Sequence, residues 1–495
     1  MKKYIFKTLI CSALALSLTT SCELDQYPDG SIPSEKSWEK VSDAQKFYTG
    51  LLNSFRNVTG GSHNYVSEIQ TDLFNAAFGV AQLNKMHDWT FTTAQFDGDG
   101  KWANNFGLVT NANNILDNID KVPAQNAQEK EILKNIKGAA YFARAFAYAN
   151  MLPRYCKEYN EATAASDLGL PLLKTVDVNA KPFRAKLDKT VEFILGDIAA
   201  ADTLIMEGTD ITAPNKNVLT ALKARVLLYK KDYEGAIEAA TSLFADYPLA
   251  TPDAYAAMWT DDVASEIIFQ PLMTPSERGG SYGTIFMAYN EAQSAWNPYY
   301  LPTQGLMDLY EAGDVRKDVF FTKDMINAGD QKETGYYFSK FPGNPALYKA
   351  GEGKTNSFYN MCKVFRTSEM YLIAAEASLF KAQRDEATAL SLLKTLRQNR
   401  GLETGNLTGD ALVQLLKKEW VREMVGEGFR LDCLKRWGDG VKRMDPQPFT
   451  ANILVQTPGS VDLNVQPSGD LYYKMVWELP LNDTEANGNL EPYWK

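Results

Sequence analysis

The sequence predicts a mostly α-helical protein: a tetratricopeptide-type scaffold of about four helix pairs that carries long, aromatic-bearing loop insertions. Apolar residues recur at helical spacing from about residue 42 onward. Small residues also stand twelve positions apart in two helix-length segments, 217–249 and 369–400. Residues 271–362, by contrast, combine many Gly, Pro and aromatic residues with few periodic runs, which predicts functional loops. Their aromatic content argues against a disordered linker.

Alanine spacing identifies two of the helix pairs. Ala224 and Ala236 lie twelve residues apart in the first segment, and Ala377 and Ala389 repeat that spacing in the second. Small residues at this spacing let two helices approach closely, as in tetratricopeptide repeats of about 34 residues. Such repeats need stacked neighbours to bury their apolar faces. Two further pairs are therefore expected, from segments 129–151 with 190–205 and 42–55 with 109–119.

The other segments are expected to carry less regular structure. Residues 64–105 form a smaller loop-rich insertion, and the tail 446–495 is predicted to be mostly loop with one strand at 471–479. We divide the chain into an N-terminal helical region, 35–270, and a C-terminal region, 271–495. The two regions are expected to form one structural unit.

The N-terminus has the pattern of an export signal. Three lysines precede a short apolar run at 9–18, and small residues then lead to Cys22. The run is too short to span a bilayer as a mature helix, so residues 1–21 are predicted to be a lipoprotein signal peptide. Cys22 would then carry lipid, and residues 22–34 would form a polar tether. The alternative is an ordinary signal peptide whose cleavage leaves an incidental cysteine.

Charge and cysteine usage exclude several functions. The formal net charge is −10, which disfavours nucleic-acid binding. Cys156, Cys362 and Cys433 are an odd number spread widely, so one disulfide between two of them stays an open alternative. The sequence has no CxxC pair and no zinc-ligand cluster. No cofactor and no metal centre are expected, although a structural cation is left open.

Catalysis has little support in the sequence. His63 and His87 are the only histidines, and the chain lacks HExxH, GxxxxGK[ST] and GxGxxG motifs. One GxSxG match occurs at 279–283, but both histidines precede it and its flanks are predicted to be loop, so we interpret it as chance. Carboxylates alone could cleave glycosides, but 61 acidic residues make candidate pairs inevitable. The protein is predicted not to be an enzyme.

The densest group of charges lies between Glu419 and Arg436. It alternates glutamates and arginines at one-turn spacing, and Gly428 is expected to break the helix in its middle. A carboxylate site is one interpretation. We favour an ion network that fixes the last helix to the scaffold, since each carboxylate has an arginine near it in sequence.

Four motifs in the C-terminal half resemble one protein family. They are RTSEMYLIAAEA at 366–377, LRQNRG at 396–401, the charged stretch 419–436, and WELP at 477–480 with the residues up to 490. Their order and spacing resemble those of SusD/RagB proteins. Cys433 replaces the usual leucine, and Glu-Leu-Pro replaces the usual Pro-Ile-Pro. Neither departure suggests altered chemistry.

The resemblance implies a function and a partner. SusD/RagB proteins are outer-membrane lipoproteins built on four tetratricopeptide pairs, and they cover a SusC-like TonB-dependent transporter. They bind glycans or oligosaccharides most often, sometimes peptides, and are not known as catalysts. We therefore expect a cell-surface, lipid-anchored nutrient-binding protein. The alternatives are a peptide-binding member of the family, a tetratricopeptide scaffold for protein partners, and a glycoside-cleaving enzyme.

Sugars stack on exposed aromatic rings and bond to Asn, Asp and Arg, so the loop aromatics are the candidates for the binding site. Trp102 and Trp296 are the preferred pair, because indole offers the largest ring face and an N–H donor. Both are expected to be partly exposed in loops that meet on one surface. The candidate ligand-binding residues fall in three sets: Trp89, Phe91, Trp102 and Asn105; Arg278, Tyr282, Trp296, Tyr299 and Tyr300; and Tyr336 with Tyr337.

Overall fold

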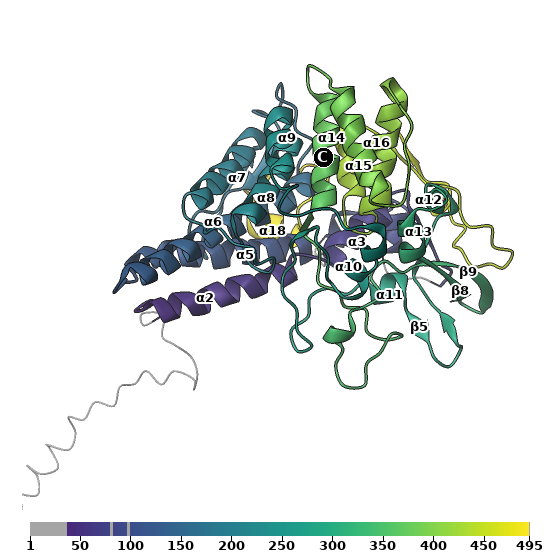
Figure 1. The fold of residues 1–495 in the computed structure, drawn as a ribbon, viewed down its shortest axis with the longest axis horizontal. Coiled ribbons are helices and arrows are strands. Elements are labelled where there is room, and N and C mark those ends of the chain that lie inside the picture. The colour runs from purple at the N-terminus through teal and green to yellow at the C-terminus, as the bar shows by residue number, and fades with distance from the viewer. Residues whose placement is uncertain (1–36, 80–82, 97–99, 495) are drawn as a thin grey trace, which may run out of the picture.

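The computed structural model describes residues 37–494 except 80–82 and 97–99, so the predicted signal peptide, Cys22 and the tether lie outside the described residues. The fold is mostly helical, as predicted (Figure 1). The scaffold helices are α2 (Val41–Ser54), α5 (Gly100–Asn118), α6 (Ala127–Tyr155), α7 (Leu187–Asp202), α8 (Lys216–Lys230), α9 (Tyr233–Thr241), α14 (Thr367–Phe380), α15 (Glu386–Gln398), α16 (Gly409–Met424) and α17 (Arg430–Trp437). Shorter helices are α3 (Ser62–Gln70), α4 (Asn84–His87), α10 (Ala257–Thr260), α11 (Gly283–Phe286), α12 (Gln304–Met307), α13 (Val315–Phe320) and α18 (Leu481–Ala486).

The four predicted helix pairs are in contact. α2 packs on α5, α6 on α7, α8 on α9, and α14 on α15, while α14 also packs on α9 and so joins two pairs. The alanines that predicted the close approach, Ala224, Ala236, Ala377 and Ala389, are fully buried. In Figure 1 the helices α7, α9, α14, α15 and α16 follow one another across the upper part of the molecule.

Side-chain caps fix where several of these helices begin. Asn126 accepts a hydrogen bond from the Glu129 backbone N–H at 2.9 Å at the start of α6. Asp385 does the same for the Thr388 N–H at 3.0 Å at the start of α15. Each cap satisfies one of the N–H groups that a helix start leaves unpaired, typically worth about 1 kcal/mol.

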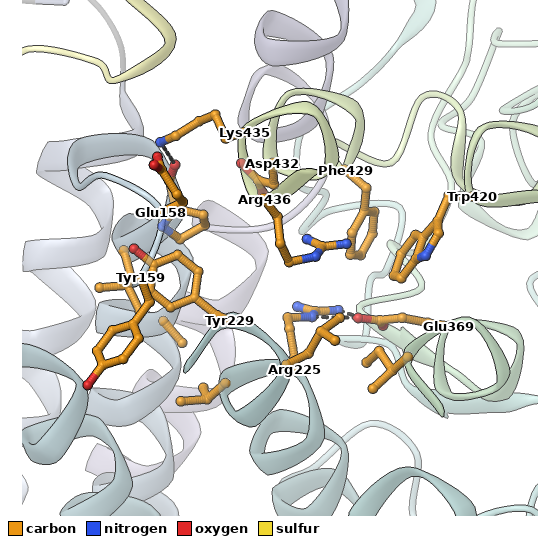
Figure 2. Close-up of a pocket in the computed structure, with 16 residues that line it drawn as sticks. Glu158, Tyr159, Arg225, Tyr229, Glu369, Trp420, Phe429, Asp432, Lys435 and Arg436 are labelled. Atoms are coloured by element: carbon orange, nitrogen blue, oxygen red, sulfur yellow. Dashed lines mark hydrogen bonds and ion pairs between the residues drawn. The ribbon is translucent and has the colours of Figure 1, made fainter. Parts of the chain in front are cut away.

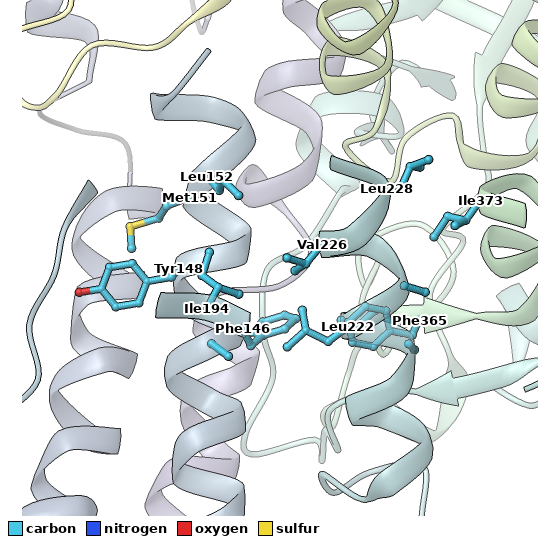
Figure 3. Close-up of a cluster of buried hydrophobic side chains, with 14 of the residues drawn as sticks. Phe146, Tyr148, Met151, Leu152, Ile194, Leu222, Val226, Leu228, Phe365 and Ile373 are labelled. Atoms are coloured by element: carbon cyan, nitrogen blue, oxygen red, sulfur yellow. The ribbon is translucent and has the colours of Figure 1, made fainter. Parts of the chain in front are cut away.

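The main apolar core lies between the helix pairs. Phe142, Phe146 and Tyr148 on α6 are at most 1% exposed, as predicted, and Tyr141 is only partly buried. Figure 3 shows side chains from α6, α7, α8 and α14 meeting in this core. The labelled residues are Phe146, Tyr148, Met151, Leu152, Ile194, Leu222, Val226, Leu228, Phe365 and Ile373.

The insertion 271–362 holds more regular structure than predicted. β8 (Phe321–Ala328) and β9 (Gln331–Phe338) form an antiparallel hairpin, and β5 (Tyr289–Asn290) and β6 (Ala295–Trp296) extend it into a sheet of order β5-β6-β8-β9. Gly329, at φ +64°, supplies the left-handed conformation for the two-residue turn. The other strands pair β1 (Phe74–Ala76) with β7 (Tyr300–Pro302), β2 (Leu168–Pro171) with β3 (Arg184–Lys186), β4 (Ile267–Phe269) with β10 (Phe365–Arg366), and β11 (Val441–Lys442) with β12 (Asn464–Val465).

The predicted strand at 471–479 is wrong. A 3₁₀ turn, Tyr472–Met475, stands there instead. The tail packs along the end of α6, where the Trp477 N–H donates to the Arg154 carbonyl at 2.7 Å. The Lys474 ammonium donates to the carbonyl of Phe91 at 2.8 Å. Hydrogen bonds to a helix end and to a loop thus take the place of the hydrogen bonds that a neighbouring strand would make with this segment in a sheet.

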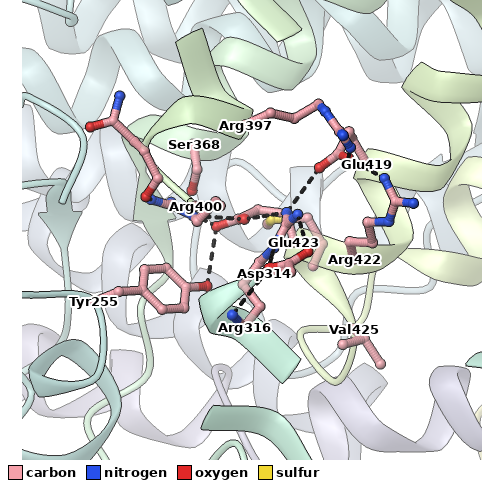
Figure 4. A network of polar contacts seen from close by, with 12 residues as sticks. Tyr255, Asp314, Arg316, Ser368, Arg397, Arg400, Glu419, Arg422, Glu423 and Val425 are labelled. Carbon is pink, nitrogen blue, oxygen red and sulfur yellow. Dashed lines mark hydrogen bonds and ion pairs between the residues drawn. The ribbon is translucent and has the colours of Figure 1, made fainter. Parts of the chain in front are cut away.

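The predicted ion network surrounds α16 (Figure 4). Glu419 and Glu423 are fully buried, and Arg316 of α13 donates to both, at 2.9 and 3.0 Å. Arg400 donates to Glu423 at 3.0 Å and to Glu266 at 2.9 Å. Desolvation is the largest single influence on both carboxyl groups and would raise their pKa values. The surrounding arginines together outweigh it, so they hold the pKa of Glu423 well below its usual range and lower the pKa of Glu419 to about 2. Both carboxylates are therefore charged at neutral pH.

The three cysteines left open by the sequence are free thiols. Cys156 and Cys433 are buried, and Cys362 is partly buried. Burial raises the pKa of each thiol to about 11, so all three are protonated and unreactive at neutral pH.

In the described part of the chain, no helix is both long and apolar enough to cross a membrane.

Both histidines are buried, which predicts a loss of stability in mild acid. Burial, with Lys101 nearby, lowers the pKa of His63 to about 3, and burial beside Arg443 lowers that of His87. In the unfolded chain each histidine binds a proton near pH 6.5, whereas in the folded chain it stays neutral at that pH. The contribution of the neutral histidines to the free energy of unfolding is therefore fully present above pH 6.5, and it is lost as the pH falls toward the folded-state pKa.

We expect His63→Gln to flatten this decline between pH 7 and 5, because it removes one of the two groups. Urea unfolding at several pH values measures the slope for both proteins. If the free energy of unfolding fell equally steeply with pH in the variant and the wild type, His63 would not be a source of the acid sensitivity.

Candidate functional site

Exposure divides the predicted ligand-binding residues into two groups. Seven are buried: Trp89, Phe91, Trp102, Asn105, Tyr282, Tyr300 and Tyr337. Four are partly exposed: Arg278, Trp296, Tyr299 and Tyr336. A buried ring has no free face on which a sugar can stack, so only the second group can present its side chains at the surface.

The prediction that Trp102 is partly exposed in a loop is wrong. α5 begins at Gly100, so Trp102 and Asn105 lie on the helix and face inward. Trp102 is 4% exposed, and its ring centroid lies 4.9 Å from that of Tyr155. The Asn105 amide donates to the Lys101 carbonyl at 2.7 Å within the helix. Both residues therefore take part in helix packing.

Trp89 and Phe91 are covered by the C-terminal tail. The Trp89 indole N–H donates to the Gln70 carbonyl at 2.7 Å. The Phe91 ring centroid lies 5.7 Å from that of Trp494, and the Lys474 ammonium lies 4.8 Å from the same Phe91 centroid. These residues were predicted as loop aromatics, but a segment distant in sequence buries them.

Tyr282 and Tyr300 are also packing residues. Tyr282 stacks on Phe341 with a centroid distance of 3.8 Å, and its hydroxyl accepts a hydrogen bond from the Asn64 amide at 2.8 Å. Tyr300 lies on β7 opposite Ala76 of β1 and is fully buried. Their local sequence is rich in Gly and Pro, yet both rings face the second apolar core.

A group that we name the Trp296 cluster is the strongest candidate surface. It consists of Tyr289, Trp296, Asp324 and Tyr337, on strands β5, β6, β8 and β9. The Trp296 ring stacks on Tyr337 at 4.4 Å between centroids, and Tyr289 meets it edge-on at 4.9 Å. The Trp296 indole N–H donates to the exposed Asp324 carboxylate at 3.0 Å. Contacts on several sides therefore fix the orientation of a partly exposed indole.

The sheet gives this cluster a rigid base. Trp296 pairs with Tyr289 across β5–β6 and with Ile326 across β6–β8. Burial raises the pKa of Tyr337 to about 12, so its phenol keeps its proton at neutral pH. The other Asp324 carboxylate oxygen accepts the Met325 backbone N–H at 2.7 Å, and because a carboxylate oxygen can accept more than one hydrogen bond, a sugar hydroxyl could also donate to this exposed group. The arrangement suits binding of a flat ligand with hydroxyl groups.

The other partly exposed candidates lie apart from the cluster or have partners already. Arg278 donates to Glu352 at 2.5 Å, which lowers the pKa of Glu352 to about 2, and its guanidinium lies 3.9 Å above the Tyr359 ring. Tyr336 neighbours Tyr337 on β9, and successive side chains of a strand point to opposite faces. Tyr336 is therefore not placed beside the Trp296 ring. Tyr299 packs at the edge of the second core.

Sequence reasoning missed Tyr289 and Asp324. Asp324 lies in β8, and residues 321–338 were treated as loop although two eight-residue strands flank a Gly-Asp turn there. That turn signal predicts a hairpin and would have placed Asp324 near Tyr337.

Within the described residues, no three His, Cys, Asp or Glu side chains are grouped so that they could hold a metal ion.

The GxSxG match does not form a nucleophile site. The Ser281 hydroxyl donates to the Phe358 carbonyl at 3.0 Å and accepts the Gly283 N–H at 3.1 Å. His63 and His87 are buried with partners of their own: His63 lies 3.4 Å from the Asn104 amide, and His87 lies 3.0 Å from the Phe74 carbonyl. The Ser281 hydroxyl therefore makes structural hydrogen bonds and is paired with neither histidine.

A pocket of ≈ 70 Å³ lies among helices α6, α8, α14, α16 and α17 (Figure 2). Arg225 donates to Glu369 through two bonds of 2.7 Å, and Arg436 lies above it in the view. Asp432 and Arg436 of the charged stretch 419–436, which we expected only to pack on the scaffold, also line this pocket. The walls are mainly apolar, and no predicted ligand-binding residue is among them.

Comparison with known proteins identifies a family from the sequence and the fold from solved structures. The profile described as the SusD family matches residues 282–494, and the profile described as starch-binding associating with outer membrane matches residues 24–228. A curated relative, SusD-like protein P38 of Formosa agariphila, is 25% identical over 242 residues, which are 47% of this chain. The match spans only 44% of that relative's length.

Solved structures share the fold over 92% of this chain. A SusD superfamily protein from Bacteroides thetaiotaomicron has a TM-score of 0.77 at 22% identity and is covered over its full length. A SusD-like carbohydrate binding protein from Bacteroides vulgatus, 98% covered, has a TM-score of 0.72 at 20% identity, and a laminarin binding SusD-like protein, 99% covered, has 0.70 at 17%. With two profiles that together match most of the chain, the protein belongs to the SusD/RagB family.

Proposed function

We propose that this protein is a cell-surface glycan-binding lipoprotein that holds an oligosaccharide on Trp296 and delivers it to a SusC-like TonB-dependent outer-membrane transporter. The observation that carries the binding site is the partly exposed Trp296 indole, fixed by Tyr337 on one side and by Asp324 at its N–H. Such a ring offers an apolar face bordered by acceptors, which matches the C–H face and hydroxyl edge of a sugar.

The family supports the ligand class. One matching profile is described as starch-binding, and relatives with the same fold are described as carbohydrate binding and laminarin binding. Uncharged glucans are therefore the first ligands to test. We propose a peptide-binding role only as the alternative within the same family.

The anchor and the scaffold belong to the same proposal. Cys22 would hold the protein at the outer membrane, and residues 22–34 would let the folded part reach the transporter. We propose that the contacting pairs α2–α5, α6–α7, α8–α9 and α14–α15 are tetratricopeptide-type units. Regions 35–270 and 271–495 would act as one body, because β4 of the first region pairs with β10 of the second.

Trp296→Ala is expected to weaken oligosaccharide binding by about fivefold to a hundredfold, the cost of about 1–3 kcal/mol for removing a stacked ring. Isothermal titration with maltohexaose and laminarihexaose measures the change. Because Trp296 is partly exposed, the melting temperature should change little.

Tyr336→Ala is the matched control, since it removes a partly exposed ring from the opposite face of the hairpin. It should leave affinity unchanged. Equal losses in both variants would contradict a site at Trp296, and release of reducing ends from either oligosaccharide would contradict a purely binding role.

A further inference from the structure

A second surface cavity, of ≈ 250 Å³, lies where the C-terminal tail meets the loop after α6. We name it the tail cavity. One wall is the loop 157–167 and the other is made by the 3₁₀ turn Tyr472–Met475 and the last residues of the chain. The lining residues are Lys157, Glu158, Asn160, Thr163, Asp167, Lys435, Tyr472, Tyr473, Met475, Val476 and Tyr493. It is separate from the Trp296 cluster, with which it shares no residue.

Both walls are held by hydrogen bonds to neighbouring elements. On the loop side, the Leu187 and Asp188 N–H groups donate to the carbonyls of Asp167 and Ala164 at 3.0 and 3.1 Å. The lining residue Lys435 donates to the carbonyls of Pro153 and Cys156 at 2.5 and 2.7 Å, which ties α17 to the end of α6. On the tail side, the Trp494 indole N–H donates to the Val476 carbonyl at 2.9 Å. The cavity is thus preformed, and a ligand would not have to order its walls.

Three tyrosines line this cavity. Tyr473 is 45% exposed, and its ring meets Trp494 edge-on at 5.4 Å between centroids, so the ring is supported while part of it remains open. Tyr472 and Tyr493 are partly buried. Burial raises the pKa of both, so their phenols stay protonated and can donate and accept hydrogen bonds at neutral pH.

Polar groups with spare bonding capacity stand beside these rings. Glu158 makes no hydrogen bond or ion pair with any described residue, although it is only partly exposed. The exposed Asn160 side chain accepts the Ala162 N–H at 3.0 Å through its oxygen, which leaves its amide N–H groups for a ligand. Asp167, in contrast, already pairs with Lys157 at 3.0 Å.

We propose that the tail cavity is a second saccharide-binding site that takes an uncharged sugar. The open Tyr473 ring provides a stacking surface, Asn160 provides donors and Glu158 provides acceptors for hydroxyl groups. The lining holds two carboxylates, Glu158 and Asp167, and two amino groups, Lys157 and Lys435, so their charges offset one another and the cavity suits an uncharged sugar. The ligand class rests on the proposed function, whereas the site rests on residues that do not contribute to the Trp296 cluster.

The test measures binding of maltohexaose and laminarihexaose by isothermal titration to the wild type, Trp296→Ala, Tyr473→Ala and the double variant. We expect Trp296→Ala to retain one binding event, and Tyr473→Ala in that background to weaken it by about fivefold to a hundredfold. Phe183→Ala is the control, because it removes a 72% exposed ring that lines neither site. Melting temperatures should be unchanged, since Tyr473 is well exposed.

The outcomes separate the two proposals. If the double variant binds as well as Trp296→Ala, the tail cavity is not a sugar site. If Tyr473→Ala removes binding while Trp296→Ala has no effect, the inference stands and the site at Trp296 fails. If neither oligosaccharide binds the wild type, both proposals fail. Glu158→Gln, made in the Trp296→Ala background, gives a second measurement. Saturation-transfer NMR measures how strongly the protein prefers glucose over glucuronic acid. This preference should narrow when the carboxylate is removed, whereas a purely structural role of Glu158 would leave it unchanged.

Discussion

Glu423→Ala is expected to lower the free energy of unfolding by about 3–5 kcal/mol, because removing one partner of a buried ion pair leaves uncompensated charge in the interior. Glu423 is fully buried and accepts hydrogen bonds from Arg316, Arg366 and Arg400. The Tyr255 hydroxyl also donates to it, at 3.3 Å. Three guanidinium groups would lose an anionic partner at once. Chemical unfolding followed by circular dichroism measures the loss.

Glu192→Ala is the control for this variant. Glu192 is 64% exposed and pairs with Lys189 at 2.8 Å on the surface of α7, so its removal should cost less than about 1 kcal/mol. Glu423→Gln should fall between the two, because it keeps the shape but loses the charge. A loss at Glu423 no larger than that at Glu192 would show that the network adds little to stability.

The network explains why residues far apart in sequence hold one body together. Arg316 lies on α13, Arg400 follows α15, and Arg366 ends β10, while Glu266 directly precedes β4. All three arginines reach Glu423 of α16. A charged cluster of this kind fixes the relative positions of its elements, since any displacement would leave buried charges unpaired.

The helix pairs could be predicted because their signal is local. Ala224 with Ala236 and Ala377 with Ala389 stand at the spacing expected of closely packed helix pairs, and all four are buried. Periodicity also placed α6 and α7 within a few residues of their observed bounds. The boundary of α5 was less accurate, because its first turns follow a Gly-rich segment that carries no apolar period.

The exposure of the loop aromatics could not be predicted, because it depends on segments distant in sequence. Trp89 and Phe91 have loop-like neighbours, but Trp494 and Lys474 from the other end of the chain cover them. Local composition cannot reveal such coverage. Trp296 kept its predicted partial exposure because its neighbours in the sheet cover it only in part.

Trp102→Ala is expected to lower the free energy of unfolding by about 3–5 kcal/mol, the usual cost of truncating a buried tryptophan. Trp102 is 4% exposed and lies 4.9 Å from Tyr155, which in turn lies 6.1 Å from Trp477 of the tail. Removal of its ring would therefore loosen the contact between α5, α6 and the C-terminal tail. Trp102→Phe, which keeps a ring, should cost less, and Trp296→Ala should cost little because that ring is partly exposed.

The same three proteins test which tryptophan binds ligand, by unfolding and by titration with maltohexaose and laminarihexaose. Trp102→Phe should bind like the wild type, because its small loss of packing leaves the Trp296 cluster intact. Trp296→Ala should lose affinity while it stays folded. If Trp102→Phe lost affinity at an unchanged melting temperature, Trp102 would have to reach the ligand, which would require the start of α5 to open in the bound state. The buried packing of Trp102 against Tyr155 makes that opening costly, and because of this cost we propose Trp296, not Trp102, as the ring that stacks on the sugar.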